Sequence, residues 1–238
     1  MVKQTMVFGH RGYPAKFPEN SLAGFTYAVE HQIEGLEFDV HLTKDSVPVI
    51  MHDEKINRTT NGKGYIQDYT LAELRQFKLA NGDPVPTLAE FLKLVANQEV
   101  QLNLEFKTDK IQYPNIERIV MGMVHATPLR HPVIFSSFHL PTIKRCQALA
   151  PDELYCWLTD KRVKDPVDFV RQEHLAGLHL SHYQDGVPVV ERIWTVDSVR
   201  QAKRLFQDHV AGIFTDDFVT MMALKRELLD ASDASTQN

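Results

Sequence analysis

Two carboxylates placed two positions apart in one short apolar run are the residues of this chain best suited to bind a cation. They are Glu37 and Asp39, within the run 35–42. Side chains at positions i and i+2 of a β-strand point to the same face, so a strand here brings the two carboxylates side by side. Like charges this close repel each other unless a positive group lies between them, and a hard cation with oxygen ligands is the simplest such group.

A histidine is expected to join this carboxylate pair through a hairpin. Segment 47–51 follows the strand too closely for a parallel crossover, which needs a dozen residues or more. It should therefore return as an antiparallel arm after a turn near 44–46. Simple antiparallel pairing then places His52 beside Asp39, so two carboxylates and a histidine meet at one spot.

Short apolar runs that alternate with amphipathic segments supply the elements that position these groups. Besides the hairpin arm, strands are expected at 6–9, 35–42, 101–107, 133–136, 154–158, 177–180, 192–196 and 212–216. Helices are expected at 21–31, 87–95, 116–124, 141–149, 167–174, 198–206 and 220–229, with a shorter one near 71–77. Eight strands that alternate with helices in a chain of 238 residues indicate an α/β fold, the (β/α)8 TIM barrel.

The chain is expected to form a single barrel domain over residues 1–230. The polar, glycine-rich segment 54–85 follows the hairpin and reads as an insertion that caps one end of the barrel. One βα unit is shortened, because 182–191 is interrupted by a glycine and a proline and cannot hold a crossover helix. This predicts a bare patch on the barrel wall, covered either by a neighbouring loop or by a second subunit. The polar residues 231–238 are expected to form a disordered tail.

Charged and aromatic residues cluster where several of these strands end. The catalytic groups of a (β/α)8 barrel lie at the carboxyl ends of its strands, and charges inside a barrel are costly unless they are paired or metal-bound. The residues found at those ends are His10, Arg11, Glu37, Asp39, Glu105, Lys107, Trp194 and Asp216. Their shared position predicts one site.

Three of these residues, Glu37, Asp39 and Glu105, would supply carboxylate ligands to one divalent cation. Oxygen ligands suit Mg²⁺ or Ca²⁺ better than Zn²⁺, and Mn²⁺ accepts them as well. Arg11 offers a guanidinium fork that matches phosphate oxygens, and Lys107 adds a second positive charge. A cation and two basic side chains at one point indicate an anionic substrate, most simply a phosphate ester.

Two histidines complete the predicted chemistry. The imidazoles of His10 and His52 suffice for one general base and one general acid. Other interpretations stay open for single motifs: Trp194 could be ordinary barrel packing, and Glu105 and Lys107 could be a simple ion pair along one strand. The joint pattern, rather than any one motif, is what predicts a site.

An ordered series of motifs along nearly the whole chain resembles the glycerophosphodiester phosphodiesterase family. The motifs are Gly9-His10-Arg11-Gly12, Pro18-Glu19-Asn20-Ser21, Glu37-Phe38-Asp39-Val40, Pro48-Val49-Ile50-Met51-His52-Asp53, Glu105-Phe106-Lys107, Trp194-Thr195-Val196 and Gly212-Ile213-Phe214-Thr215-Asp216. The resemblance implies a TIM barrel with a small insertion after the His-Asp motif. It also implies metal-dependent hydrolysis of glycerophosphodiesters, such as glycerophosphocholine, to sn-glycerol 3-phosphate and an alcohol.

By motif position, the resemblance implies a role for each of these residues. His10 and His52 are the acid–base pair, Glu37, Asp39 and Glu105 bind the metal, Arg11 and Lys107 hold the phosphate, and Trp194 and Phe138 line the pocket for the glycerol part. Glu19 and Asn20 are expected to shape the first loop and to cap the first helix. The implied mechanism is attack of the glycerol 2-hydroxyl on phosphorus, followed by opening of the cyclic phosphate by water.

The chain departs from the family pattern at a few positions. Asp197 stands where the family usually has Asn, and Phe218 replaces a common Pro. Neither position is expected to carry the chemistry. Family members usually have a helix where 182–191 is short, so the wall there, and any dimer contact through it, differs from the pattern.

The bulk composition excludes several other classes of partner. A formal net charge of −5 gives no reason to expect nucleic acid or anionic membrane as the partner. No apolar run approaches the roughly 18–20 residues that span a bilayer. No apolar signal sequence precedes the first strand, and Cys146 and Cys156 suggest buried thiols in a reducing cytosol, so a cytoplasmic location is expected. The sequence does not distinguish a monomer from a dimer.

Two other functions are alternatives to this one. A phospholipase D-like enzyme acting on lysophospholipids or sphingolipids would need an apolar approach to the site, whereas the insertion is polar around 57–64. A catalytically inactive barrel that binds glycerophosphodiesters would be expected to lack a metal carboxylate or a histidine, and all of these are present. The small, water-soluble substrate is therefore preferred.

Overall fold

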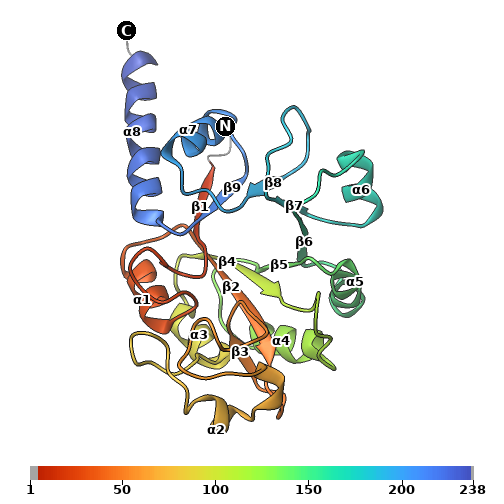
Figure 1. Ribbon diagram of the computed structural model, residues 1–238. Coiled ribbons are helices and arrows are strands. Elements are labelled where there is room, and N and C mark those ends of the chain that lie inside the picture. Colours follow the sequence, from red (N-terminus) through yellow and green to blue (C-terminus); the bar gives the residue numbers. More distant parts are fainter. Residues whose placement is uncertain (1–4, 237–238) are drawn as a thin grey trace.

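Eight parallel strands close into a barrel in the computed structural model, which describes residues 5–236 (Figure 1). The strands are β1 (Met6–Gly9), β2 (Gly35–Leu42), β4 (Gln101–Phe106), β5 (Ile134–Ser137), β6 (Leu154–Thr159), β7 (Gly177–Leu180), β8 (Glu191–Ile193) and β9 (Gly212–Thr215). β1 pairs with both β2 and β9, which closes the ring. β3 (Pro48–Ile50) pairs antiparallel with β2 as the predicted hairpin arm. The expected (β/α)8 fold is confirmed.

Helices follow most of the strands and cover the outside of the barrel (Figure 1). They are α1 (Leu22–Glu30), α3 (Leu88–Val95), α4 (Ile116–His125), α5 (Leu140–Leu149), α6 (Pro166–Gln172), α7 (Val199–Gln207) and α8 (Phe218–Thr236). α8 is longer than expected, because it continues through residues 231–236, where a disordered tail was predicted. The last two residues of that predicted tail, 237–238, lie outside the described residues. Within 5–236, no helix is both long and apolar enough to cross a membrane.

β2 is buried on both faces, and the two faces differ in chemistry. On the outer face, the Phe38 ring centroid lies 4.2 Å from that of Phe91 in α3, which in turn lies 4.6 Å from that of Phe25 in α1. Side chains alternate along a strand, so this apolar contact with the helices turns the intervening residues inward. Glu37 and Asp39 therefore face the interior of the barrel.

The segment between β7 and β8 contains no helix in the described structure, which confirms the shortened unit at 182–191. The segment is tied to the neighbouring loop between β6 and α6. The side-chain amide of Gln184 donates to the carbonyl of Val163 over 3.1 Å and accepts the Val163 N–H over 2.8 Å. The Gln184 N–H donates to Glu191 Oε2 over 3.0 Å, and Tyr183 packs against the main core.

The insertion 54–85 forms a small apolar core of its own around η1 (Ile66–Asp68) and α2 (Leu71–Leu74). The buried residues of this core are Val49, Met51, Ile56, Ile66, Leu74 and Val85. Two of them belong to the hairpin arm, so the insertion packs directly on the segment that carries His52. The Ile66 N–H also donates to the carbonyl of Glu54 over 2.9 Å.

Candidate active site

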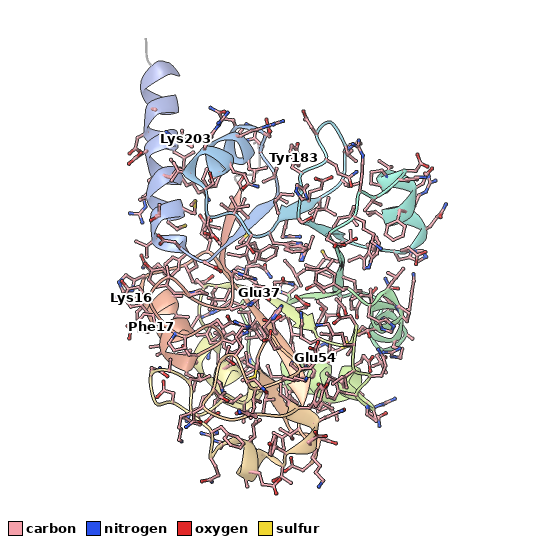
Figure 2. The ribbon with its side chains drawn as sticks, viewed as in Figure 1. Lys16, Phe17, Glu37, Glu54, Tyr183 and Lys203 are labelled. Atoms are coloured by element: carbon pink, nitrogen blue, oxygen red, sulfur yellow. The ribbon has the colours of Figure 1, made fainter. Side chains whose placement is uncertain are left out.

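The nine residues expected in the site come together at the carboxyl ends of the strands. Seven of them line one pocket, together with Asn103, Leu158 and Phe214; they are His10, Arg11, Glu37, His52, Glu105, Phe138 and Trp194. The other two, Asp39 and Lys107, are buried against this lining. Figure 2 shows Glu37 near the middle of the molecule. A wider depression between 124–133 and 150–153 lies at the opposite end of the barrel, at the amino ends of β5 and β6.

Three carboxylates form a compact group in the barrel interior. Glu37, Asp39 and Glu105 each offer an oxygen, and these oxygens lie within 4.8 Å of one another. Asp39 Oδ1 is buried and has no hydrogen-bond partner among the described residues, whereas buried oxygens normally have one. Lys107 Nζ, at 3.7 Å, is too far away to donate a hydrogen bond to it. A bound cation would satisfy this oxygen, so the group fits a divalent metal site.

Burial tends to raise the pKa of all three carboxyl groups, but nearby charges make the final shifts differ. Burial and the charges of Asp39 and Glu105 raise the pKa of Glu37 well above its ordinary value. Burial also raises the pKa of Glu105 to about 7, although Lys107 donates a 2.7 Å hydrogen bond to it. Burial likewise disfavours the charge on Asp39, but Lys107 and other nearby cations outweigh this effect and hold the pKa of Asp39 well below its ordinary range. Cation binding would therefore displace protons from the site.

Arg11 lies in the turn after β1, and its backbone has a conformation that few residues other than glycine adopt. Its φ of +54° lies in the left-handed region, which costs about 1–2 kcal/mol for a residue other than glycine. Its N–H donates to Glu37 Oε2 over 2.9 Å, and its carbonyl accepts from the Asn20 N–H over 2.8 Å. Its guanidinium donates to Glu19 Oε1 over 3.0 Å and lies 3.5 Å from Asp39 Oδ2. These contacts hold the guanidinium at the edge of the carboxylate group.

Asn20 and Glu19 have different roles from those expected. Asn20 does not cap α1; the cap is Ser21, whose Oγ accepts the Gly24 N–H over 3.1 Å. The side-chain amide of Asn20 instead donates to Asp39 Oδ2 over 2.8 Å. Glu19 does more than shape the loop, because it accepts from the guanidinium described above. Both residues lie in the loop that follows β1, and His10 lies in the same loop. That shared position is the sequence signal for their roles in the site.

His10 is oriented by a carboxylate that follows β9. Its Nδ1 lies 2.7 Å from Asp216 Oδ1. Asp216 is itself held by Asp197, whose Oδ1 accepts the Asp216 N–H over 2.8 Å and the Thr215 hydroxyl over 2.9 Å. A carboxylate at Nδ1 leaves Nε2 available for proton transfer. The sequence predicts only that Asp216 lies at a strand end, and it predicts no role for Asp197.

His52 has a similar arrangement on the other side of the pocket. Its Nδ1 lies 2.8 Å from Asp53 Oδ1. Its backbone carbonyl lies 3.1 Å from Nε2 of the buried His41, whose Nδ1 lies 2.8 Å from the Tyr113 hydroxyl. Burial lowers the pKa of His52 below its ordinary value, against the raising effect of the Asp39 charge. The roles of Asp53 and His41 were not predicted.

Two aromatic side chains form one wall of the pocket. Phe138 and Trp194 meet edge to face, with ring centroids 5.6 Å apart and an interplanar angle of 82°. Trp194 follows β8 directly, and its Nε1 is buried without a hydrogen-bond partner among the described residues. This wall offers an apolar surface and one unpaired donor, which suits a small molecule that carries both carbon atoms and hydroxyl groups.

The site therefore combines parts that act together in phosphoryl transfer. It has a carboxylate group fit for a divalent cation, a guanidinium beside it, and two histidines that each face a carboxylate through Nδ1. Positive groups stabilise the charge on phosphoryl oxygens, and the histidines can move protons.

Comparisons with known proteins agree with this chemistry. The model of the Glycerophosphoryl diester phosphodiesterase family matches residues 10–220. The chain is 32% identical to a glycerophosphodiester phosphodiesterase from Caldanaerobacter subterraneus subsp. tengcongensis, over 94% of this chain and 99% of that protein. It is also 32% identical to one from Bacillus altitudinis, over 89% and 94% of the two chains. Among solved structures it is similar to an Oleispira antarctica phosphodiesterase in complex with the product sn-glycerol-3-phosphate, with a TM-score of 0.83, 25% identity and coverage of 93% and 96%.

Proposed function

Because the chain belongs to the glycerophosphoryl diester phosphodiesterase family, we propose that it hydrolyses glycerophosphodiesters to sn-glycerol 3-phosphate and an alcohol. The observation that carries the proposal is the convergence, in one pocket, of a three-carboxylate cation site, a guanidinium and two histidines. The product bound to the Oleispira antarctica relative supports the same product for this chain. The buried, unpaired thiols of Cys146 and Cys156 support action in the cytoplasm.

One divalent cation is part of the proposal. Glu37, Asp39 and Glu105 would hold it, and Mg²⁺, Ca²⁺ and Mn²⁺ all accept such a set of ligands. When bound, it would stabilise the negative charge that develops on the phosphoryl oxygens. Lys107 limits the repulsion between Asp39 and Glu105, and Arg11 is placed to bind a phosphoryl oxygen.

The two histidines would divide the proton transfers between them. In the first step the glycerol 2-hydroxyl attacks phosphorus, His10 Nε2 accepts its proton, and His52 Nε2 protonates the departing alcohol. The products are the alcohol and a cyclic glycerol phosphate. In the second step water attacks phosphorus, His52 accepts the water proton, and His10 returns its proton to the 2-oxygen. General acid–base catalysis of this kind contributes about 10²–10⁴-fold for each group.

Release of sn-glycerol 3-phosphate from glycerophosphocholine tests the proposal. The protein is stripped with EDTA, and Mg²⁺, Ca²⁺ or Mn²⁺ is then added back singly, with His10→Ala as the control. Activity that returns with a cation and is lost in the variant is the expected result. A substrate that lacks the 2-hydroxyl should not be turned over, and equal turnover of that analogue would favour direct attack by water.

The same assay with a lysophospholipid addresses the alternative substrate. Preferential turnover of the lysophospholipid would replace the proposed substrate class. Tight binding of glycerophosphocholine without turnover, under every cation, would instead identify a binding protein.

A further inference from the structure

One guanidinium of the insertion bridges two carboxylates beside the pocket. Arg58 Nη1 and Nη2 donate to Glu19 Oε2 and Oε1 over 2.5 and 2.7 Å. Its Nε and Nη2 donate to Asp53 Oδ2 and Oδ1 over 2.7 and 3.0 Å. Both contacts are paired, and paired contacts of this kind fix geometry as well as contributing energy. Arg58 itself is not part of the pocket lining.

Each of these carboxylates also holds one group of the proposed chemistry. Glu19 Oε1 accepts from Arg11 Nη1 over 3.0 Å. Asp53 Oδ1 lies 2.8 Å from His52 Nδ1. Arg58 is therefore the shared partner of the residue that orients Arg11 and of the residue that orients His52.

We propose that Arg58 is a positioning residue that sets the phosphate-binding guanidinium of Arg11 and the imidazole of His52 relative to each other. The proposal rests on the proposed function, because it assigns roles to those two groups. Without Arg58, Glu19 keeps only its contact with Arg11 within residues 5–236, and Asp53 keeps only its contact with His52. No described side chain then links the guanidinium of Arg11 to the imidazole of His52 through these two carboxylates. Removal of a hydrogen-bond partner that orients a residue of the site typically lowers activity about 10–100-fold.

The alternative is that Arg58 only anchors the insertion. The insertion has other anchors, however: its apolar core, the Lys44 N–H that donates to the carbonyl of Tyr69 over 2.8 Å, and the Leu71 N–H that donates to Asp45 Oδ1 over 2.9 Å. The side chain of Arg58 is 48% exposed, so its loss leaves no buried cavity. Its two carboxylate contacts are thus better explained by the site than by the insertion.

Substitution of Arg58 and of a matched arginine separates the two explanations. Arg75 belongs to the same insertion and donates to Glu90 Oε1 over 2.8 Å, and neither residue lines the pocket. Arg58→Gln is expected to lower kcat/KM about 10–100-fold, with a loss in kcat and a rise in KM, whereas Arg75→Gln should change either by less than about twofold. In Arg58→Ala, added ethylguanidinium should restore part of the lost activity; in Arg75→Ala it should have no effect.

A measurement without substrate keeps this proposal separate from the proposed function. The hydrogen-bonded ring N–H proton of His52 is followed by NMR. It is expected to shift and broaden in Arg58→Gln, while the ring N–H signals of His41 stay unchanged. Unchanged His52 signals together with unchanged kcat and KM would overturn the proposal. A wild-type protein that turns over no substrate, but whose His52 signal still depends on Arg58, would refute the proposed function alone.

Discussion

Asp39 lies directly opposite Glu105 in the parallel pairing of β2 with β4. Strand register alone thus brings together two carboxylates from distant parts of the sequence, and Glu37 lies two residues earlier on the same face. A slip of one residue would turn all the side chains of one strand to its other face. The apolar packing of Phe38 outside the barrel therefore also protects the carboxylate group inside it.

Replacement of Lys107 should have an effect that depends on the cation. Lys107→Met removes one partner of a buried ion pair, so it should destabilise the cation-free protein by about 3 kcal/mol. Saturating Ca²⁺ should reduce this loss, because the cation restores positive charge. Urea unfolding with EDTA and with Ca²⁺ measures both values, and equal losses would contradict the prediction. Lys144→Met, at a half-exposed ion pair with Glu173, should cost less than about 1 kcal/mol in both conditions.

Cation binding should strengthen as the pH rises through about 7. Burial raises the folded-state pKa of Glu105 to about 7, so the folded, cation-free protein keeps a proton that the unfolded chain has released. This group's contribution to the stability of the cation-free protein therefore falls as the pH rises from about 4.5 to 7. A cation removes the penalty, so its effect on Tm should be larger at pH 8 than at pH 5.5. Glu105→Gln should reduce this pH dependence, and what remains should come from Glu37, whose pKa burial also raises.

Loss of the carboxylate partner of His10 should lower kcat with little change in KM. Asp216→Asn keeps the size of the side chain but no longer fixes the His10 proton on Nδ1, so a fall in kcat of about 10²-fold is expected. Steady-state kinetics with glycerophosphocholine measures it. Asp217→Asn is the matched control, because Asp217 bonds to Thr220 instead. A similar fall in both variants would show a general structural effect.

Asp197 should tolerate Asn but not Ala. Its Oδ1 accepts both hydrogen bonds that hold Asp216 and Thr215, and the amide oxygen of Asn can accept the same two. Asp197→Asn should keep kcat/KM within about threefold, whereas Asp197→Ala should lower it about tenfold or more and lower Tm, because it leaves a donor unpaired. Lost activity in Asp197→Asn would mean that the charge itself is needed.

Most of the three-carboxylate cluster could be predicted from the sequence, because its positions follow from the regular geometry of β-strands. Alternation along β2 puts Glu37 and Asp39 on one face, and the short link to β3 forces the hairpin that brings His52 to them. The placement of Glu105 in the site follows from the rule that catalytic groups lie at the carboxyl ends of barrel strands. These inferences depend on periodicity and chain length, which a single sequence displays directly.

The partners of these groups could not be predicted in the same way. Asn20 and Ser21 are both good helix caps, and the choice between them depends on the left-handed φ of +54° at Asn20, which tertiary contacts impose. Arg58 lies in an insertion without regular periodicity, so its contacts with Glu19 and Asp53 follow only from the folded loop. The spacing of residues in the sequence therefore does not predict which side chains orient the residues of the site.

The barrel wall between β7 and β8 has no helix in the described structure and is expected to be the least stable part of the barrel. The segment there is held through Gln184, whereas α3 packs its Phe91 ring against Phe38 of β2. The free energy needed to separate neighbouring strands should be smallest at this point. Amide protons of Leu178 and Leu180 should then exchange with solvent sooner than those of β2. Since β8 leads directly into Trp194, the aromatic wall of the pocket should be more mobile than the carboxylate group on β2.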